Sequence, residues 1–286
     1  MVDCIIVGSG MAAISAALTL KAQGKTFEMV GSEQLSKKIA LAEKISNYPA
    51  FCGGSGKELV ALLKRQLVES GVAVTDARVV GVYAMGKTVS VQTSDNRLLE
   101  GRCAILATGV SAAKLVEGEE EFLGRGVSYC ATCDAALYKG KRVILIATGK
   151  EGENEAAILE RFAEKLYYVP LYKGAAFAPK KQNTEIFVDG LLKIEGNLRV
   201  ERAVFKGRII DADGVFLSKE SVPLSTVCGG LKTEGAHVVV DRAMRTNLPG
   251  LFAAGDCTGK PYQYAKAVGE GCVAAHSATE YLDALA

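Results

Sequence analysis

The alternation of apolar and polar residues divides the first part of the chain into strands and amphipathic helices. An apolar strand over residues 2–7 meets a glycine-rich turn, then a helix that stops near Gly24, then a strand over 26–30. From about 57 to 70 the leucines recur at helical spacing, which predicts a helix with one buried face. Short strands with turns fill residues 72–100, and an apolar strand over 103–107 follows them.

The middle of the chain repeats this pattern. A buried strand over 142–146 leads into a helix from about 153 to 165 and a strand over 166–171, which together form a second βαβ unit. Further short strands are predicted near 185–188, 191–194, 199–205 and 208–210.

The end of the chain returns to the pattern of its beginning. A strand over 238–240 and an apolar run over 251–254 precede a closing helix from about 264 to 285. Two similar βαβ units, the second inserted into the first, predict an α/β fold. An acidic run over 117–121 predicts a connector with a solvent-exposed face.

Composition narrows the class of protein. The chain has 286 residues, of which 49% are hydrophobic and 23% charged, a balance typical of a soluble globular protein with two domains. Its formal charge of +2 and its lack of charged blocks do not favour nucleic-acid binding. The N-terminus lacks the features of a signal peptide and no stretch is long enough to span a membrane, which predicts a cytoplasmic location.

Cys130 and Cys133 form a C-x-x-C motif that Asp134 follows directly. Two thiols at this spacing open and close a disulfide by thiol–disulfide exchange, and the adjacent carboxylate is placed to transfer the proton. The alternative is a structural metal half-site, which needs a second ligand pair. The sequence offers none, because His237 and His276 are isolated and the six other cysteines are scattered singly. The motif therefore favours redox chemistry over a metal.

The first turn reads Gly8-Ser9-Gly10-Met11-Ala12-Ala13 between a strand and a helix. In this G-x-G-x-x-A fingerprint, Gly8 makes the turn, Gly10 lets a pyrophosphate approach the backbone, and Ala13 packs the helix on the strand. The helix N-terminus then offers free N–H groups to the phosphates. Glu33, just past the second strand, is placed to bind the adenosine ribose, and Glu28 within the strand is the weaker candidate. The alternative is a glycine turn without a ligand.

With these residues collected, nearly the whole chain resembles the low-molecular-weight thioredoxin reductases. The motif at 130–134 matches that family's redox site, and Gly8 to Ala13 resembles its FAD fingerprint. Ala107-Thr108-Gly109 resembles the family's A-T-G turn, and Ala254-Gly255-Asp256 resembles its late A-G-D motif. Ser46-Asn47-Tyr48-Pro49 stands where the family has an Asn-aromatic-Pro turn beside the flavin.

This resemblance implies two Rossmann-like three-layer domains. FAD is expected in a discontinuous domain of residues 1–114 and 238–286, and the redox motif in an inserted domain of residues 115–237. By the same resemblance, Cys133 lies next to the flavin, Cys130 attacks thioredoxin, Asp134 is the acid, and the protein is a homodimer. The residues expected to hold FAD are Gly8, Ser9, Gly10, Met11, Ala12, Ala13, Gly31, Ser32, Glu33, Gln34, Leu35, Asn47, Ala107, Thr108, Gly109, Gly255, Asp256, Gln263, Tyr264 and Ala265.

The second βαβ turn departs from the members that use NADPH. Those members read G-G-G-N-S/T-A and then H-R-R-x-x-x-R, whereas here Ala147 replaces the first glycine. Glu151, Glu153 and Glu155 crowd the helix start, where a pyrophosphate needs positive charge. The next strand is followed by Tyr172-Lys173-Gly174, with one lysine and no arginine for a 2′-phosphate. The inserted domain therefore resembles a degenerate nicotinamide domain.

Without nicotinamide, the resemblance narrows to the ferredoxin-dependent flavin thioredoxin reductases. A ferredoxin donates one electron at a time and is commonly acidic, so its docking face should be basic. The sequence does not choose among three basic groups, Lys37-Lys38-Lys44, Lys139-Lys141-Arg142 and Lys180-Lys181. The alternatives are an NADPH-dependent thioredoxin reductase, a flavin dithiol oxidase that uses oxygen, and a non-catalytic flavin redox sensor.

A second departure lies before the last helix. The family's R-Q-A reads Tyr262-Gln263-Tyr264 here, and Gln263 keeps a hydrogen bond available to the flavin. A tyrosine beside it is placed either to stack on the flavin or to pack the start of the helix.

Overall fold

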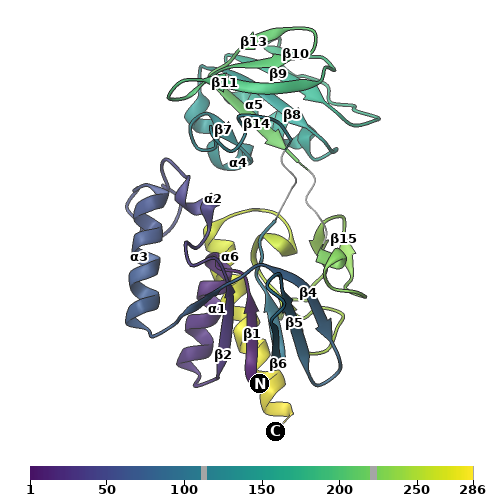
Figure 1. The fold of residues 1–286 in the computed structure, drawn as a ribbon. Coiled ribbons are helices and arrows are strands. Elements are labelled where there is room, and N and C mark those ends of the chain that lie inside the picture. The colour runs from purple at the N-terminus through teal and green to yellow at the C-terminus, as the bar shows by residue number, and fades with distance from the viewer. Residues whose placement is uncertain (111–114, 220–223, 286) are drawn as a thin grey trace. The chain divides into compact units, whose positions relative to one another are not determined.

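The structure is a computed structural model that describes residues 1–110, 115–219 and 224–285. The chain forms two compact units: one combines Met1–Ser111 with Val222–Ala286, and the other is Ala112–Ser221 (Figure 1). Each unit contains a β-sheet built around parallel strands, with helices packed on it, so the predicted α/β fold is confirmed. The predicted domain boundary at residue 114 lies outside the described residues.

In the described part of the first unit, one sheet has the order β3-β2-β1-β6-β5-β4, and β17 also pairs with β6. Its strands are β1 (Val2–Val7), β2 (Phe27–Gly31), β3 (Val74–Asp76), β4 (Val79–Ala84), β5 (Val89–Thr93), β6 (Leu98–Leu106) and β17 (Leu251–Ala253). The pairs that involve β1, β2, β3 and β17 are parallel, whereas β4, β5 and β6 form an antiparallel meander. Alternate residues of β1 enter opposite cores, since Ile6 packs on one face and Ile5 on the other.

Helices α1 (Met11–Ala22) and α6 (Tyr264–Ala284) lie side by side and share one core with the sheet (Figure 1). Their contact is close because Gly271 has no side chain: a Cβ there would lie 2.2 Å from the carbonyl oxygen of Ala12. Ser15 Oγ also donates to the carbonyl of Val268 at 2.7 Å. The beginning and the end of the chain are thereby joined in one unit.

The rest of the described first unit consists of helix α3 and several short elements around this frame. They are α2 (Lys37–Ala40), α3 (Gly56–Glu69), η2 (Leu224–Thr226), β15 (Thr233–Glu234), β16 (His237–Val238) and η3 (Gly255–Thr258). Helix α3 begins at a capping box, in which Ser55 Oγ accepts from the N–H of Glu58 and the Glu58 carboxylate accepts from the N–H of Ser55.

The second unit has a parallel sheet with the order β10-β9-β8-β14-β7 among its described residues, and a separate antiparallel sheet β11-β12-β13. The strands are β7 (Val127–Ser128), β8 (Arg142–Ala147), β9 (Lys165–Pro170), β10 (Thr184–Ile186), β11 (Leu191–Gly196), β12 (Val200–Phe205), β13 (Ile209–Asp211) and β14 (Gly214–Ser218). Helix α5 (Gly152–Phe162) packs on β8 and β9, and the short α4 (Ala131–Asp134) leads into η1 (Ala135–Tyr138).

Three local predictions need correction. Strand β14, which pairs with β8 inside the second sheet, was not predicted, because its short apolar run carries no clear periodicity. The strand predicted over 238–240 is the two-residue β16, His237–Val238, which pairs with β15. The acidic run over 117–121 is not solvent-exposed throughout, since the side chain of Glu119 is only 1% exposed.

Candidate functional site

The glycine-rich turn between β1 and α1 has the geometry that a dinucleotide fingerprint requires. Gly8 adopts a φ of +128°, and a Cβ on it would lie 2.1 Å from the carbonyl oxygen of Ala107. Glycine is therefore needed where β1 and β6 end side by side. A Cβ on Gly10 would meet nothing within 4 Å, so the backbone at the start of α1 is open to a ligand.

The first amides of α1 lie next to this open space. The carbonyl of Gly10 accepts from Ile14 at 3.0 Å, but no described residue accepts a backbone hydrogen bond from Met11, Ala12 or Ala13. Free N–H groups at the positive end of a helix dipole form a site for a phosphate group.

The end of β2 is tied to the same turn. Ser9 Oγ accepts from the N–H of Ser32 at 3.0 Å, and a Cβ on Gly31 would lie 2.9 Å from the backbone carbon of Gly8. The chain then reverses, because the N–H of Leu35 donates to the carbonyl of Ser32 at 2.8 Å.

The two acids predicted as candidates for ribose binding differ in their surroundings. Glu33 and Gln34 are exposed on the turn after β2. The Glu28 carboxylate instead accepts from Thr75 Oγ1 on β3 at 3.0 Å, so one of its oxygens is already engaged within the sheet.

Three parallel strands, β1, β6 and β17, end at one edge of the sheet. The N–H of Ala107 donates to the carbonyl of Val7 at 2.8 Å, and the N–H of Ala254 donates to that of Leu106 at 2.9 Å. A Cβ on Gly255 would lie 2.9 Å from the Cβ of Ala12, so the late A-G-D turn contacts the start of α1. The A-T-G and A-G-D motifs therefore meet the first fingerprint in space.

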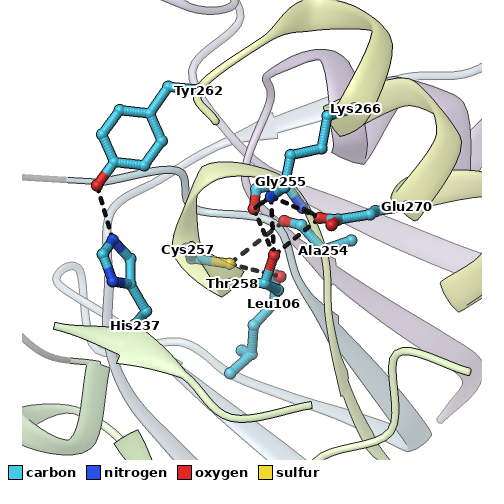
Figure 2. A network of polar contacts seen from close by, with 9 residues as sticks. All are labelled: Leu106, His237, Ala254, Gly255, Cys257, Thr258, Tyr262, Lys266 and Glu270. Atoms are coloured by element: carbon cyan, nitrogen blue, oxygen red, sulfur yellow. Dashed lines mark hydrogen bonds and ion pairs between the residues drawn. The ribbon is translucent and has the colours of Figure 1, made fainter. Parts of the chain in front are cut away.

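Asp256 follows this contact, on the short helix η3. Burial raises the pKa of the Asp256 carboxyl, and the positive charges of Lys38 and Lys266 partly offset that effect. Lys266 and Glu270, which no sequence motif marks, lie on α6 and hydrogen-bond to Gly255 beside Asp256 (Figure 2).

The residues predicted at the other end of the flavin also come together. Asn47 Nδ2 donates to Gln263 Oε1 at 2.8 Å, and the ring of Tyr48 meets that of Tyr264 edge-on at 6.2 Å. Tyr262 does not join this pair of rings in the same way; its hydroxyl lies 2.7 Å from Nε2 of His237 (Figure 2). Ala265 is exposed in the first turn of α6.

The edge formed by these residues fits FAD. It combines an open glycine and free helix amides for a pyrophosphate with an exposed acid after β2 for a ribose. The half-buried carboxyl of Asp256 and the amide pair of Asn47 and Gln263 supply further polar groups for the remainder of the FAD molecule.

The redox motif lies in the second unit, where it begins α4. Cys130 is disulfide-bonded, and the N–H of Asp134 donates to its carbonyl at 3.1 Å. The cysteines described as free all lie outside the motif, and the side chain of Cys133 lies outside what the structure describes. Ser128, which lies before the motif and outside its sequence pattern, accepts through Oγ from the N–H of Cys130 at 3.1 Å and donates to Asp134 Oδ2 at 2.6 Å. One hydroxyl therefore connects the first cysteine to the acid.

A buried ion pair stands beside the motif. Lys219 contacts the carboxylate of Glu119, and the two side chains are 9% and 1% exposed. Glu119 also accepts from the Tyr129 hydroxyl and from the N–H of Leu115, each at 2.7 Å. Burial by itself raises the pKa of Glu119, but these hydrogen bonds and the charge of Lys219 outweigh it and lower the pKa. Tyr129, the residue directly before Cys130, is thus held in place by the hydrogen bond of its hydroxyl to Glu119.

The second glycine turn, between β8 and α5, is packed differently from the first. A Cβ on Gly152 would lie 2.2 Å from the Cβ of Ala147. In the first fingerprint the glycine comes first, as Gly8, and the alanine last, as Ala13, whereas here the order is reversed. The methyl group of Ala147 therefore fills the space at the start of the turn.

The first amides of α5 are not available to a phosphate. Those of Gly152, Glu153 and Asn154 donate to the carbonyls three residues earlier, each at 3.1 Å. The Glu153 carboxylate accepts from the Tyr172 hydroxyl at 2.8 Å and from the N–H of Ala176 at 2.9 Å. A carboxylate thus bridges from the helix start to the loop after β9, where a nicotinamide dinucleotide needs positive charge.

Within the described ranges, no three His, Cys, Asp or Glu side chains are grouped so that they could bind a metal ion. Their helices also include none with the length and apolar character needed to cross a membrane.

Comparison with known proteins gives consistent matches over nearly the full length. A family described as "Pyridine nucleotide-disulphide oxidoreductase" matches residues 2–271. A thioredoxin reductase of Listeria monocytogenes is 32% identical over 304 residues, which cover 99% of this chain and 94% of that protein.

Two solved structures add to this comparison. A ferredoxin-flavin thioredoxin reductase from Clostridium acetobutylicum is 44% identical, with a TM-score of 0.60, over 99% of this chain and 98% of that one. The thioredoxin reductase of Streptococcus pyogenes MGAS5005 is 27% identical, with a TM-score of 0.88, over 99% of both chains.

Proposed function

The chain belongs to the pyridine nucleotide-disulphide oxidoreductases, and on that premise we propose that it is a thioredoxin-disulfide reductase fed by ferredoxin. Two reduced ferredoxins each give one electron, two protons are taken up, and one thioredoxin disulfide becomes a dithiol. The family consists of FAD flavoproteins, and FAD, when bound, is the centre that collects single electrons and passes them on as a pair. The homodimer stays a prediction from the family resemblance, and the cytoplasmic location stays a prediction from the sequence.

The choice of electron donor is supported most directly by the second glycine turn. Ala147 fills the turn, the first amides of α5 are satisfied within the chain, and Glu153 adds negative charge. Losing two charge-assisted hydrogen bonds to a dinucleotide costs on the order of 3–6 kcal/mol, about two to four decades in affinity. The similarity to the ferredoxin-flavin enzyme of C. acetobutylicum points in the same direction.

The chain's own residues then carry the exchange with thioredoxin. Once the electron pair has reduced the C-x-x-C disulfide to two thiols, the Cys130 thiolate attacks one sulfur of the thioredoxin disulfide. A mixed disulfide forms, and the second thioredoxin sulfur leaves as a thiolate that takes a proton from Asp134. Cys133 then attacks the Cys130 sulfur, which releases the other thioredoxin thiol and restores the C-x-x-C disulfide. Ser128 holds Asp134 beside Cys130 throughout, through its two hydrogen bonds.

An anaerobic comparison of donors tests this proposal. The FAD-loaded protein is mixed with NADPH, NADH or reduced ferredoxin, the loss of flavin absorbance is followed, and oxidised thioredoxin is then added. We expect ferredoxin alone to bleach the flavin and thioredoxin to restore its colour. Rapid bleaching by NADPH would return the protein to the NADPH-dependent thioredoxin reductases. Bleaching by no donor, together with oxygen uptake on a small dithiol, would identify a dithiol oxidase.

A further inference from the structure

The turn that carries Asp256 is held by side chains of α6 (Figure 2). Glu270 Oε2 accepts from the N–H of Gly255 at 2.8 Å and from Lys266 Nζ at 3.0 Å. Lys266 Nζ also donates to the carbonyl of Gly255 at 2.9 Å. The Thr258 hydroxyl, at the end of η3, lies 2.8 Å from Glu270 Oε2 and 3.1 Å from Lys266 Nζ.

The Gly255 N–H therefore donates to Glu270, while the Gly255 carbonyl accepts from Lys266 and also from the Thr258 hydroxyl at 2.8 Å, so side chains of α6 and η3 together hold this peptide. Gly255 itself is constrained, with a φ of +87° and room for no Cβ against Ala12. The side chains of Lys266 and Glu270 are only 18% and 19% exposed, so this pair is screened less by water than a surface pair. The orientation of the next residue, Asp256, depends on how this peptide is held.

We propose that Lys266 and Glu270 are positioning residues for FAD, which set the Gly255–Asp256 peptide against the start of α1. This inference rests on the proposed placement of FAD along the ends of β1, β6 and β17. Glu270 accepts from the Gly255 N–H and so orients this peptide, and Lys266 balances the two carboxylates, its partner Glu270 and the half-buried Asp256, beside a dianionic pyrophosphate. An uncharged residue at position 266 would leave Glu270 without its ion-pair partner and Asp256 with Lys38 as its remaining nearby positive charge.

The test compares FAD affinity with stability of the FAD-free protein. The variants are Lys266→Met, which keeps the length but removes the charge, Lys266→Arg, which keeps both charge and donors, and Glu270→Gln. Glu280→Gln is the matched control, because Glu280 lies on the same helix and pairs with Arg245 at 3.1 Å on the surface. The dissociation constant is measured by titrating the FAD-free protein with FAD, and the visible circular dichroism of the bound flavin is recorded at saturation.

We expect Lys266→Met and Glu270→Gln to weaken FAD binding by about 10- to 100-fold and to change the flavin signal. Lys266→Arg and Glu280→Gln should stay within about threefold of the parent protein, and the thermal midpoint of the FAD-free forms should change little. Unchanged affinity in both charge-removing variants would overturn the positioning role. Because the measurement involves neither ferredoxin nor thioredoxin, a wrong electron donor would not affect it, whereas a parent protein without FAD affinity would end the proposed function as well.

Discussion

The Cβ of Ala147 lies so close to Gly152 that a Cβ on Gly152 would approach it to 2.2 Å. This pair reverses the glycine and alanine of the first fingerprint, where Gly8 opens the turn and Ala13 closes it. The second turn therefore keeps the packing of a βαβ unit while it loses the open backbone that a pyrophosphate requires.

Substitutions at Ala147 and Gly152 should show that the sizes of these two residues depend on each other. We expect Gly152→Ala to lower the free energy of unfolding by about 1–3 kcal/mol, because the added methyl overpacks the turn. The double variant Ala147→Gly with Gly152→Ala should have a free energy of unfolding only about 0.5–1 kcal/mol below that of the parent protein, because the remaining loss is the cost of the new glycine. Urea unfolding followed by circular dichroism measures both. A double variant as unstable as Gly152→Ala would contradict this explanation.

The two motif cysteines should behave differently towards thioredoxin. Cys133→Ser leaves Cys130 free to attack, so it should form a stable mixed disulfide with a thioredoxin that carries one activated cysteine. Cys130→Ser should form little or none under the same conditions. Mass spectrometry of the unreduced mixtures detects the adduct. Trapping by Cys130→Ser instead would exchange the two roles.

Removal of the Ser128 hydroxyl should slow this exchange. Ser128→Ala leaves the Cys130 N–H and the Asp134 carboxyl without their common partner. We expect a 3- to 30-fold loss in the single-turnover rate with thioredoxin, about the worth of one or two hydrogen bonds. Ser128→Thr keeps the hydroxyl and serves as the control, so it should retain most of the rate. Equal rates in the parent and Ser128→Ala would show that the hydroxyl does not position the acid.

The buried pair of Glu119 and Lys219 should make stability depend on pH. The pKa of Glu119 is lowered in the folded chain, so its contribution is complete above the ordinary value of 4.5 and is lost as the pH falls through the folded value. Glu119→Gln leaves the Lys219 charge buried, which should cost about 3–5 kcal/mol at neutral pH.

Urea unfolding at a series of pH values measures this effect. The difference in unfolding free energy between the parent and Glu119→Gln should shrink as the pH drops below about 4.5. Glu69→Gln removes one partner of an exposed pair, Arg65 and Glu69, and should change stability by less than about 1 kcal/mol at any pH. A difference for Glu119→Gln that stays constant with pH would contradict the ion-pair explanation.

Added salt should slow the reduction of the flavin by ferredoxin. Attraction between an acidic donor and a basic face is screened over about 10 Å at 0.1 M salt, so the rate of flavin reduction should fall between low salt and a few hundred millimolar. Reduction by a small chemical reductant is the control and should change much less. Stopped-flow absorbance measures both rates. A ferredoxin rate independent of salt would exclude electrostatic docking.

The sequence by itself determined the features that depend on local spacing. The fingerprint from Gly8 to Ala13, the C-x-x-C motif with Asp134 and the approximate bounds of α1, α3 and α6 all follow from periodicity and turn chemistry over short stretches. The divergence of the turn at Ala147 was visible in the same way. These features need only neighbouring residues to be recognised.

Only the tertiary structure decided which distant residues meet. Glu119 belongs to a run of acids that resembles a solvated connector, yet it is buried because Lys219, 100 residues later, neutralises it. The meeting of Asn47 with Gln263 spans 216 residues. Lys266 and Glu270 gain their role only where α6 packs against the start of α1, because a hydrogen bond to a glycine peptide depends on position in space and leaves no pattern in the sequence.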